Sequence, residues 1–327
     1  MSPHKIIIAS STTHGVMCAE ALHASALFAV TAVLTPQPRA IGRHQTLTPN
    51  PLHTWATTQQ VPSLLFEKTP TDLKAQLQSL DFDFLLVVDF GYFIPAWLLE
   101  LPKIAPVNIH PSALPKYRGA SPAQFVLLFG EEESAVSLIK VSAKMDQGDI
   151  IATLPFSVDQ TWTQQNYYQF AFELAVAKLT STLDDFASGK IVPTPQTSNS
   201  PTPLARQLSK NDAFVNWQTI VNTANMPITI KNIDMPTYYI ENNQSISLSH
   251  RESFPPLLTT LLKNTPLNQQ AALIERACRA FHNWPQLWTL YNGKRLQIIS
   301  CHLENNRLVL DLVKPEGKTI LPFHQLN

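Results

Sequence analysis

The sequence has no net charge and no long uninterrupted apolar segment. Its 24 Lys and Arg residues balance 24 Asp and Glu residues, which argues against a broad, nonspecific grip on nucleic acid. The longest apolar run, FLLVVDFGYFIPAWLL, is interrupted by Asp89, Gly91 and Pro95. No stretch reaches the roughly 18 to 20 clean apolar residues of a membrane span, so we expect no membrane partner.

Cysteine is also scarce. Cys18, Cys278 and Cys301 lack the spacing of metal ligands and cannot all pair as disulfides. This usage is typical of a reducing compartment. The first residues, MSPHKIIIAS, pass directly into a strand-like run without a signal-peptide pattern. We expect a cytoplasmic, monomeric protein without a bound metal.

Glycine is missing where a dinucleotide site would need it. After the first apolar run, the loop ASSTTHG contains a single glycine. A dinucleotide-binding loop carries G-x-G-x-x-G, because its phosphates lie against bare backbone. The sequence therefore argues against an NAD-binding site. It also contains no internal repeat.

The apolar periodicity predicts an α/β domain in the first part of the chain. Strand, helix and strand patterns follow one another over 5–9, 16–26 and 28–35, the order of a parallel βαβ unit. Further strands are predicted at 82–90 and 105–110, and the first of these should be buried on both faces. A half-exposed strand at 135–143 should pair as a hairpin with a strand at 148–158, and a long helix is predicted at 163–189. The expected fold is an open, Rossmann-like, mostly parallel sheet with helices on both faces.

The composition changes at residues 190–205, KIVPTPQTSNSPTPLA, which contain four prolines and no periodicity. This pattern is typical of a linker. We therefore predict a catalytic domain over 1–189, a linker over 190–205 and a small antiparallel β-domain over 206–327. Residues 201–327 carry 12 Lys and Arg against 8 Asp and Glu, which favours weak binding of a polyanion; ordinary scatter of charge is the alternative.

Polar residues gather at the end of the strand 105–110, in VNIHPSALPKYRG. Asn108 and His110 alternate along the strand and so point to the same side, and KMDQGDI supplies Asp146 from a second loop. An amide that donates to an oxyanion, a His and an Asp suit acyl transfer. No Ser or Cys is placed as a nucleophile, so direct attack by the acceptor is expected. A structural role for His110 is the alternative.

Two motifs carry a resemblance to a known family. NIHPSALPKYRGASP resembles the N-x-H-x-S-L-L-P-x-x-R-G-x-x-P signature of the folate-dependent formyltransferases, and MDQGDII resembles their L-D-x-G-D, in the same order and spacing. The resemblance implies that Asn108, His110 and Asp146 are catalytic and that 10-formyltetrahydrofolate is the donor. It also implies a folate pocket lined by Phe90, Gly91, Ile94, Ser112, Ala113, Leu114, Pro115 and Met145.

Three stretches, 34–56, 204–217 and 276–298, are similar to family members whose acceptor is the initiator tRNA charged with methionine. They match a tRNA-contacting loop, the start of the C-terminal region and the entry to an OB-like β-barrel. The resemblance implies formylation of the methionine amine for translation initiation. It also implies tRNA contacts by Arg39, Arg43, Lys294 and Arg295. Lys116 and Arg118 face either the tRNA end or the folate glutamate, or else cap local carbonyls.

Two other functions stay open: formylation of an amino-sugar nucleotide, and tRNA binding without catalysis. The sequence also departs from the family pattern. HQT follows Arg43 where lysines are common, and Ala135, Lys140 and Ala143 precede Asp146. An atypical insertion falls near 218–270, while the segment after 298 is short. We hypothesise that residues 228–249 replace the missing strands of the barrel.

Overall fold

The computed structural model describes residues 2–42, 45–225, 254–305 and 307–326. The chain forms two compact units that interleave in sequence. The first unit comprises Met1–Pro115, Ala135–Pro155 and Gln169–Asn199, and the second comprises Lys116–Ser134, Phe156–Tyr168 and Ser200–Asn327. These units differ from the sequential domains 1–189 and 206–327 that the sequence predicted. The boundaries of those domains stay a prediction.

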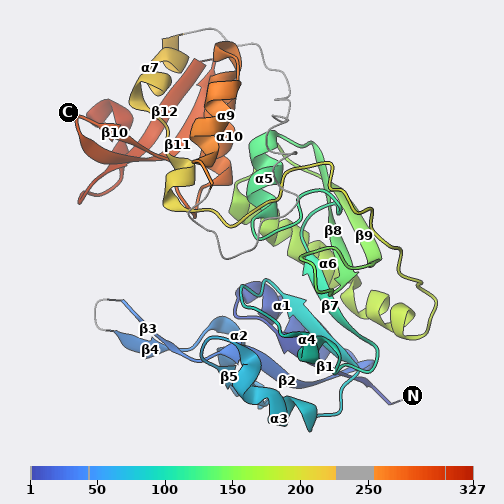
Figure 1. Ribbon diagram of the computed structural model, residues 1–327. Helices are drawn as coiled ribbons and strands as arrows, with labels where there is room; N and C mark the ends of the chain where they lie inside the picture. The colour runs from blue at the N-terminus through green and yellow to red at the C-terminus, as the bar shows by residue number, and fades with distance from the viewer. Residues whose placement is uncertain (1, 43–44, 226–253, 306, 327) are drawn as a thin grey trace. The chain divides into compact units, whose positions relative to one another are not determined.

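A seven-stranded sheet organises the first unit (Figure 1). Its strands, in spatial order, are β5 (Ser63–Phe66), β2 (Phe28–Pro36), β1 (His4–Ala9), β6 (Phe84–Val88), β7 (Ala105–His110), β8 (Glu133–Lys140) and β9 (Ile150–Ser157). The strands from β5 to β7 pair in parallel, and β8 pairs antiparallel with β7. The predicted mostly parallel α/β sheet is confirmed.

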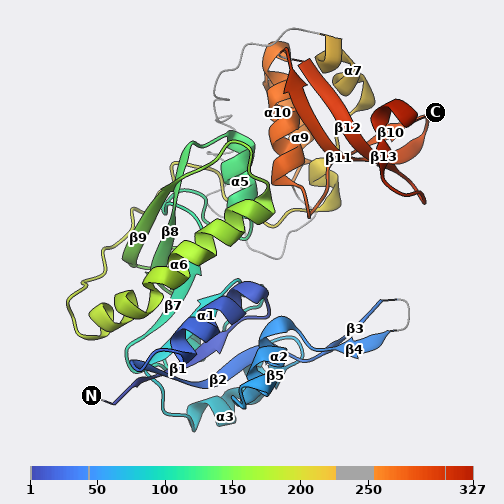
Figure 2. The same ribbon diagram turned by 180° about the vertical axis from the view of Figure 1, so that it is seen from behind.

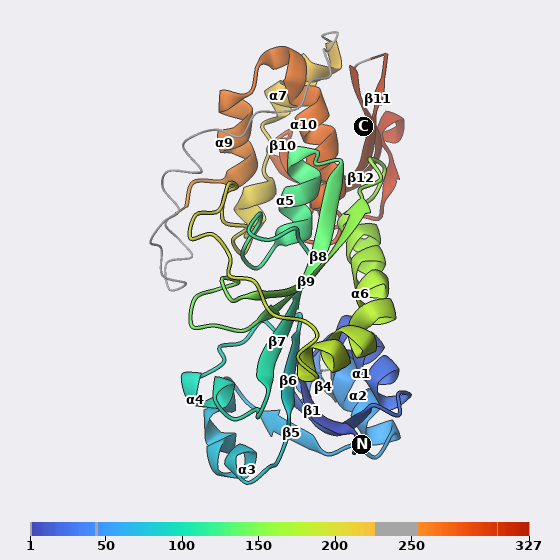
Figure 3. The same cartoon turned by 90° about the vertical axis from the view of Figure 1, so that its right-hand side faces the viewer.

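Helices cover both faces of this sheet (Figure 3). One face carries α1 (Thr13–His23), α2 (Pro51–Thr58) and α6 (Gln164–Ala187), and the other carries α3 (Lys74–Gln78) and α4 (Ala96–Leu99). Because both faces are covered, β6 is buried along its whole length, as its continuous apolar run predicted.

Strand β8 differs from its predicted half-exposed pattern. Residues 134–139 are all buried. Of the two serines in this stretch, Ser137 is fully buried, and its Oγ donates to the Ser112 carbonyl oxygen at 2.8 Å. Because the hydroxyl finds its partner inside the protein, a polar residue here does not mark a solvent-facing side.

A short hairpin follows β2. Strand β3 (Arg39–Ile41) pairs antiparallel with β4 (Thr46–Thr48), and all six residues are exposed. Figure 2 shows this hairpin extending from the rest of the first unit. Residues 43 and 44 lie outside the described residues.

The second unit contains four complete α-helices and a small sheet among its described residues. The helices are α5 (Pro122–Phe129), α7 (Trp217–Asn225), α9 (Leu257–Asn264) and α10 (Leu267–Ala280). Antiparallel strands β10 (Trp288–Tyr291), β11 (Lys294–Glu304), β12 (Arg307–Pro315) and β13 (Leu321–Pro322) follow one another in the sheet. The predicted C-terminal antiparallel β-domain is thus confirmed.

Within the atypical stretch 218–270, the described residues are mainly helical: they belong to α7, α9 and the start of α10. Residues 228–249 lie outside the described residues. The hypothesis that they replace strands of the barrel therefore stays a prediction.

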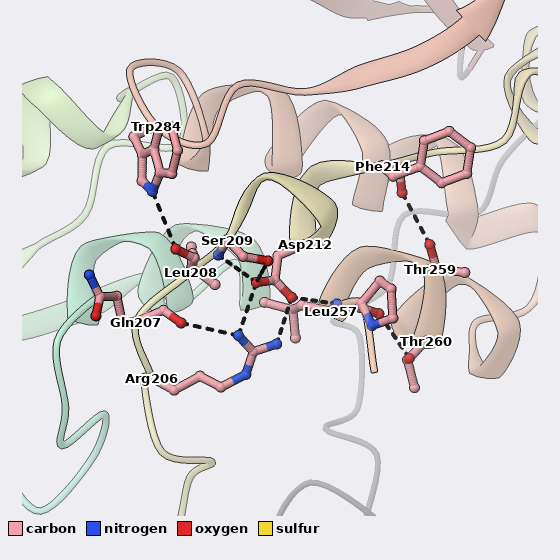
Figure 4. A network of polar contacts seen from close by, with 11 residues as sticks. Arg206, Gln207, Leu208, Ser209, Asp212, Phe214, Leu257, Thr259, Thr260 and Trp284 are labelled. Atoms are coloured by element: carbon pink, nitrogen blue, oxygen red, sulfur yellow. Dashed lines mark hydrogen bonds and ion pairs between the residues drawn. The ribbon is translucent and has the colours of Figure 1, made fainter. Parts of the chain in front are cut away.

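A buried carboxylate, Asp212, ties together the start of the C-terminal region (Figure 4). Its Oδ1 accepts from Arg206 Nη2 at 2.6 Å and from the Leu257 amide at 2.9 Å, and its Oδ2 accepts from Arg206 Nη1 at 3.0 Å. The Ser209 amide and hydroxyl also donate to Oδ2. Burial raises the pKa of Asp212, but Arg206 and the two amides outweigh burial and hold this pKa below its ordinary value. The carboxylate thus joins the turn at Lys210–Ala213 to the first residue of α9.

Candidate active site

Three polar side chains meet at the carboxyl end of β7. Asn108 and His110 alternate along the strand and share a face, and Asp146 comes from the loop between β8 and β9. Asn108 Nδ2 donates to Asp146 Oδ1 at 3.4 Å, and His110 Nδ1 lies 3.7 Å from Asp146 Oδ2. His110 is only 4% exposed. The structure therefore brings together the three residues that the sequence predicted as catalytic.

The loop that carries Asp146 has an unusual backbone. Asp146 has a φ of 52°, in the left-handed region that few residues with a side chain adopt. Two residues later, a Cβ atom on Gly148 would overlap the Lys140 carbonyl oxygen. Only glycine lets the chain return this closely to the end of β8. Lys140 N donates to the Asp149 carbonyl oxygen at 2.9 Å and closes the loop.

Residues 112–115 follow His110 and Pro111 in the loop after β7. Ser137 Oγ donates to the Ser112 carbonyl oxygen and accepts from the Leu114 amide at 3.2 Å. Ser112 is fully buried and Leu114 nearly so, whereas Ala113 and Pro115 keep part of their surface exposed. Of the four predicted pocket residues in this stretch, Ala113 and Pro115 thus offer the most surface to a ligand.

The other predicted pocket residues lie in two loops of the first unit. Phe90 and Ile94, which follow β6, pack against the buried hydrophobic core of the first unit. Val141, the residue after β8, packs against the same core. Gly91 is exposed, and Met145 is 39% exposed immediately before Asp146. Partly buried apolar side chains beside exposed backbone are suited to a flat heterocycle with polar edges. The residues present fit a folate.

A second polar pair joins the first turn of α1 to the residue after β6, and the sequence motifs did not reveal it. His14 Nδ1 lies 3.2 Å from Asp89 Oδ2, and the His14 ring stacks on Phe172 with centroids 4.2 Å apart. Asp89 directly follows β6, and His14 lies at the start of the helix after β1; polar residues that follow parallel strands are the signal that could have drawn attention to them. Asp89 also has a positive φ of 45°.

The predicted tRNA contacts fall in different parts of the chain. Arg43 lies outside the described residues. Arg39 is exposed on β3, with its guanidinium 5.6 Å from the centroid of the Tyr92 ring. Lys294, at the start of β11, is exposed, whereas the Arg295 guanidinium stacks 4.8 Å from the centroid of Trp288. Arg39 belongs to the first unit, and Lys294 and Arg295 belong to the second.

Lys116 and Arg118 are held differently. Lys116 Nζ lies 2.9 Å from Glu131 Oε2, and the hydroxyl of Tyr117 donates to Glu131 Oε1 at 2.7 Å. Arg118 is buried, with 5% exposure, and its carbonyl oxygen accepts from the Ala205 amide. Lys116 therefore retains part of its surface, whereas Arg118 is buried.

Within the ranges that the structure describes, no helix is long and apolar enough to cross a membrane. The same ranges contain no group of three or more His, Cys, Asp or Glu side chains arranged to hold a metal ion.

Sequence comparison places the chain in a known family. The sequence model of the Formyl transferase family matches residues 4–183, and that of the formyl transferase C-terminal domain matches residues 266–325. The chain belongs to the formyl transferase family, and the resemblance carried by the two motifs is confirmed. The matched span includes all three residues of the cluster at the end of β7.

Among curated proteins, the chain is similar to methionyl-tRNA formyltransferases. That of Rickettsia bellii is 32% identical over 228 residues, which cover 68% of this chain and 73% of the relative. That of Listeria innocua is 34% identical over 214 residues, covering 65% and 68%.

Solved structures with the same fold include two formyltransferases. A methionyl-tRNA formyltransferase from Clostridium thermocellum superimposes with a TM-score of 0.53 at 14% identity, covering 95% of this chain and 98% of the other. An N-formyltransferase from Helicobacter canadensis, in complex with folinic acid and dTDP-3-aminofucose, gives a TM-score of 0.57 at 16% identity, covering 98% of both chains. At such identities the structures establish the fold alone.

Proposed function

We propose that this chain transfers a formyl group from 10-formyltetrahydrofolate to the methionine amine of initiator methionyl-tRNA. The observation that carries the proposal is the meeting of Asn108, His110 and Asp146 at the carboxyl end of β7. In open α/β sheets, ligands bind in the crevice at this edge. The reaction serves translation initiation, for which we expect a cytoplasmic monomer.

Each residue of the cluster suits one part of the transfer. The amide of Asn108 donates to the formyl oxygen as negative charge develops there. His110, when protonated, adds a second donor, and its burial keeps water from weakening this interaction. The Asp146 carboxylate accepts the proton that the attacking amine loses. The bond between the formyl carbon and the folate nitrogen then breaks, and tetrahydrofolate leaves as that nitrogen takes up a proton. No covalent enzyme intermediate is required.

The folate supplies the formyl group in a form that an amine can attack. We propose that Phe90, Ile94 and Leu114 provide the apolar walls of its site, with Gly91, Ser112, Ala113, Pro115 and Met145 around it. The packing of Phe90 and Ile94 on the rigid core supports this proposal, since a fixed wall needs no ordering when the ligand binds.

The acceptor is inferred from two kinds of observation. The curated relatives described above carry the name methionyl-tRNA formyltransferase. In addition, Arg39 is exposed on the β3–β4 hairpin, and Arg43 follows it closely in the sequence. A cation on an extended hairpin suits a phosphate backbone, which small nucleotide sugars lack. We propose tRNA contacts by Arg39 and Arg43, and by Lys294 and Arg295 in the second unit.

Mass spectrometry of Met-tRNA after incubation with the protein and 10-formyltetrahydrofolate tests the proposal. We expect a gain of one formyl group on methionine. Asn108→Ala removes one donor to the oxyanion, and His110→Ala removes a second. The formylation rate of each variant should therefore fall by about a hundredfold or more. An amino-sugar nucleotide serves as the competing acceptor. Formylation of the sugar but not of Met-tRNA would overturn the proposal in favour of an amino-sugar nucleotide formyltransferase. Tight tRNA binding without turnover would indicate a tRNA-binding protein without catalysis.

A further inference from the structure

We propose that Gln196 is a positioning residue that holds Asp146 in place against Asn108 and His110. The inference rests on the proposed function, in which Asp146 takes part in the transfer. Gln196 lies in the proline-rich stretch 190–205. Its Nε2 donates to the Asp146 carbonyl oxygen at 2.9 Å and to the Gly148 carbonyl oxygen at 2.7 Å.

The Gln196 amide fixes the backbone on which the Asp146 side chain depends. A primary amide has two N–H groups, and here they engage two carbonyls of the same loop. The backbone dihedral angles of Asp146 set the direction of its carbonyl and of its Cα–Cβ bond, from which the carboxylate extends. A left-handed residue such as Asp146 keeps its conformation only where its surroundings demand it. Holding the carbonyl therefore also aims the carboxylate.

The segment that carries Gln196 is itself anchored to the sheet. Thr194 and Ile150 exchange two backbone hydrogen bonds, each of 2.8 Å. Pro193 and Pro195 flank Thr194, and their rings restrict the backbone on both sides. Because Ile150 is the first residue of β9, Gln196 reaches the loop from a fixed point beside it.

The geometry of the cluster makes this positioning important for rate. The contacts of the Asp146 carboxylate with Asn108 and His110 measure 3.4 and 3.7 Å, so a small rotation of the loop would separate them. A misplacement of about 1 Å in a reacting group can cost on the order of a hundredfold in rate. We expect loss of the Gln196 donors to lower kcat by about 10- to 100-fold, with little change in KM.

Two variants separate hydrogen bonding from packing. Gln196→Met keeps the approximate volume of the side chain without its donors, and Gln196→Glu replaces the amide by a carboxylate that repels both carbonyls. Both should lower kcat by about 10- to 100-fold while the KM for each substrate stays within about threefold. Gln147→Glu is the matched control, because it makes the same change in an exposed side chain next to Asp146. It should stay within about threefold of the unaltered protein.

A double-mutant cycle, measured in single turnovers with excess protein, tests whether Gln196 acts through Asp146. In an Asp146→Asn background, Gln196→Met should add less than about a threefold loss. Unchanged kcat in both Gln196 variants would overturn the inference while leaving the proposed function standing. A full additional loss in the Asp146→Asn background would overturn it as well. An Asp146→Asn variant with undiminished rate would instead overturn the proposed role of Asp146.

Discussion

The Asp212 carboxylate should dominate the stability of the second unit, and its removal gives a sharp test. Asp212→Ala leaves the Arg206 guanidinium, whose side chain is only 11% exposed, without its charge partner. It also removes the acceptor for the amides of Ser209 and Leu257. Breaking a buried pair in this way costs about 3 to 5 kcal/mol, so we expect the free energy of unfolding to fall by that amount.

Urea denaturation followed by tryptophan fluorescence measures this change, because four of the six tryptophans lie in the second unit. With an m-value of about 2 to 3 kcal/mol/M, the midpoint should fall by roughly 1 to 2.5 M. Replacing both partners, as Arg206→Met with Asp212→Leu, should cost less than half as much, because neither charge remains buried. A loss below about 1 kcal/mol in Asp212→Ala would refute the reasoning.

The pH dependence gives the same prediction an independent check. The folded-state pKa of Asp212 is lowered, so the stability it contributes is present above its unfolded pKa of about 4. That stability is lost as the pH falls from about 4 through the folded value. Asp212→Asn cannot titrate, so its free energy of unfolding should decline less steeply over this window. Parallel declines in the two proteins would contradict the assignment.

Three further outcomes follow from the structure. Gly148→Ala should lower kcat by about a hundredfold, because its Cβ would overlap the Lys140 carbonyl oxygen and shift the Asp146 loop; single-turnover kinetics would show it, and an unchanged rate would mean that the loop adapts. Arg39→Gln should weaken tRNA binding and reduce by about 1 the slope of log binding constant against log salt concentration, whereas an unchanged slope would exclude a phosphate contact by Arg39. Burial raises the pKa of Cys18 to about 12, so this thiol should resist alkylation at pH 8 until the protein unfolds; rapid labelling of the native protein would contradict this.

The sequence predicted the parts of the site that depend on local pattern. The strand 105–110 was expected with the same bounds as β7, because its short, mainly apolar pattern ends at the polar motif. Alternation along one strand placed Asn108 and His110 on one side, and the two motifs supplied Asp146. These features require only a few neighbouring residues, so the chain order reveals them.

Contacts between distant residues were not predicted. The stretch 190–205 was interpreted as a linker, yet Gln196 reaches a loop 50 residues earlier in the chain. Asp212 meets the Leu257 amide 45 residues later. His14 and Asp89 lie 75 residues apart in sequence. Neither composition nor periodicity encodes which distant groups will meet, because that depends on how the completed elements pack.

The sequence by itself determined the fold class, the family and the identity of the three residues at the end of β7, because apolar periodicity and short motifs are written in consecutive residues. Only the tertiary structure decided that Ser137 is buried against Ser112, that Asp146 adopts a left-handed backbone and that the Gln196 amide holds its loop. Each of these depends on hydrogen-bond partners supplied by a different element, and such partners exist only once the sheet has assembled.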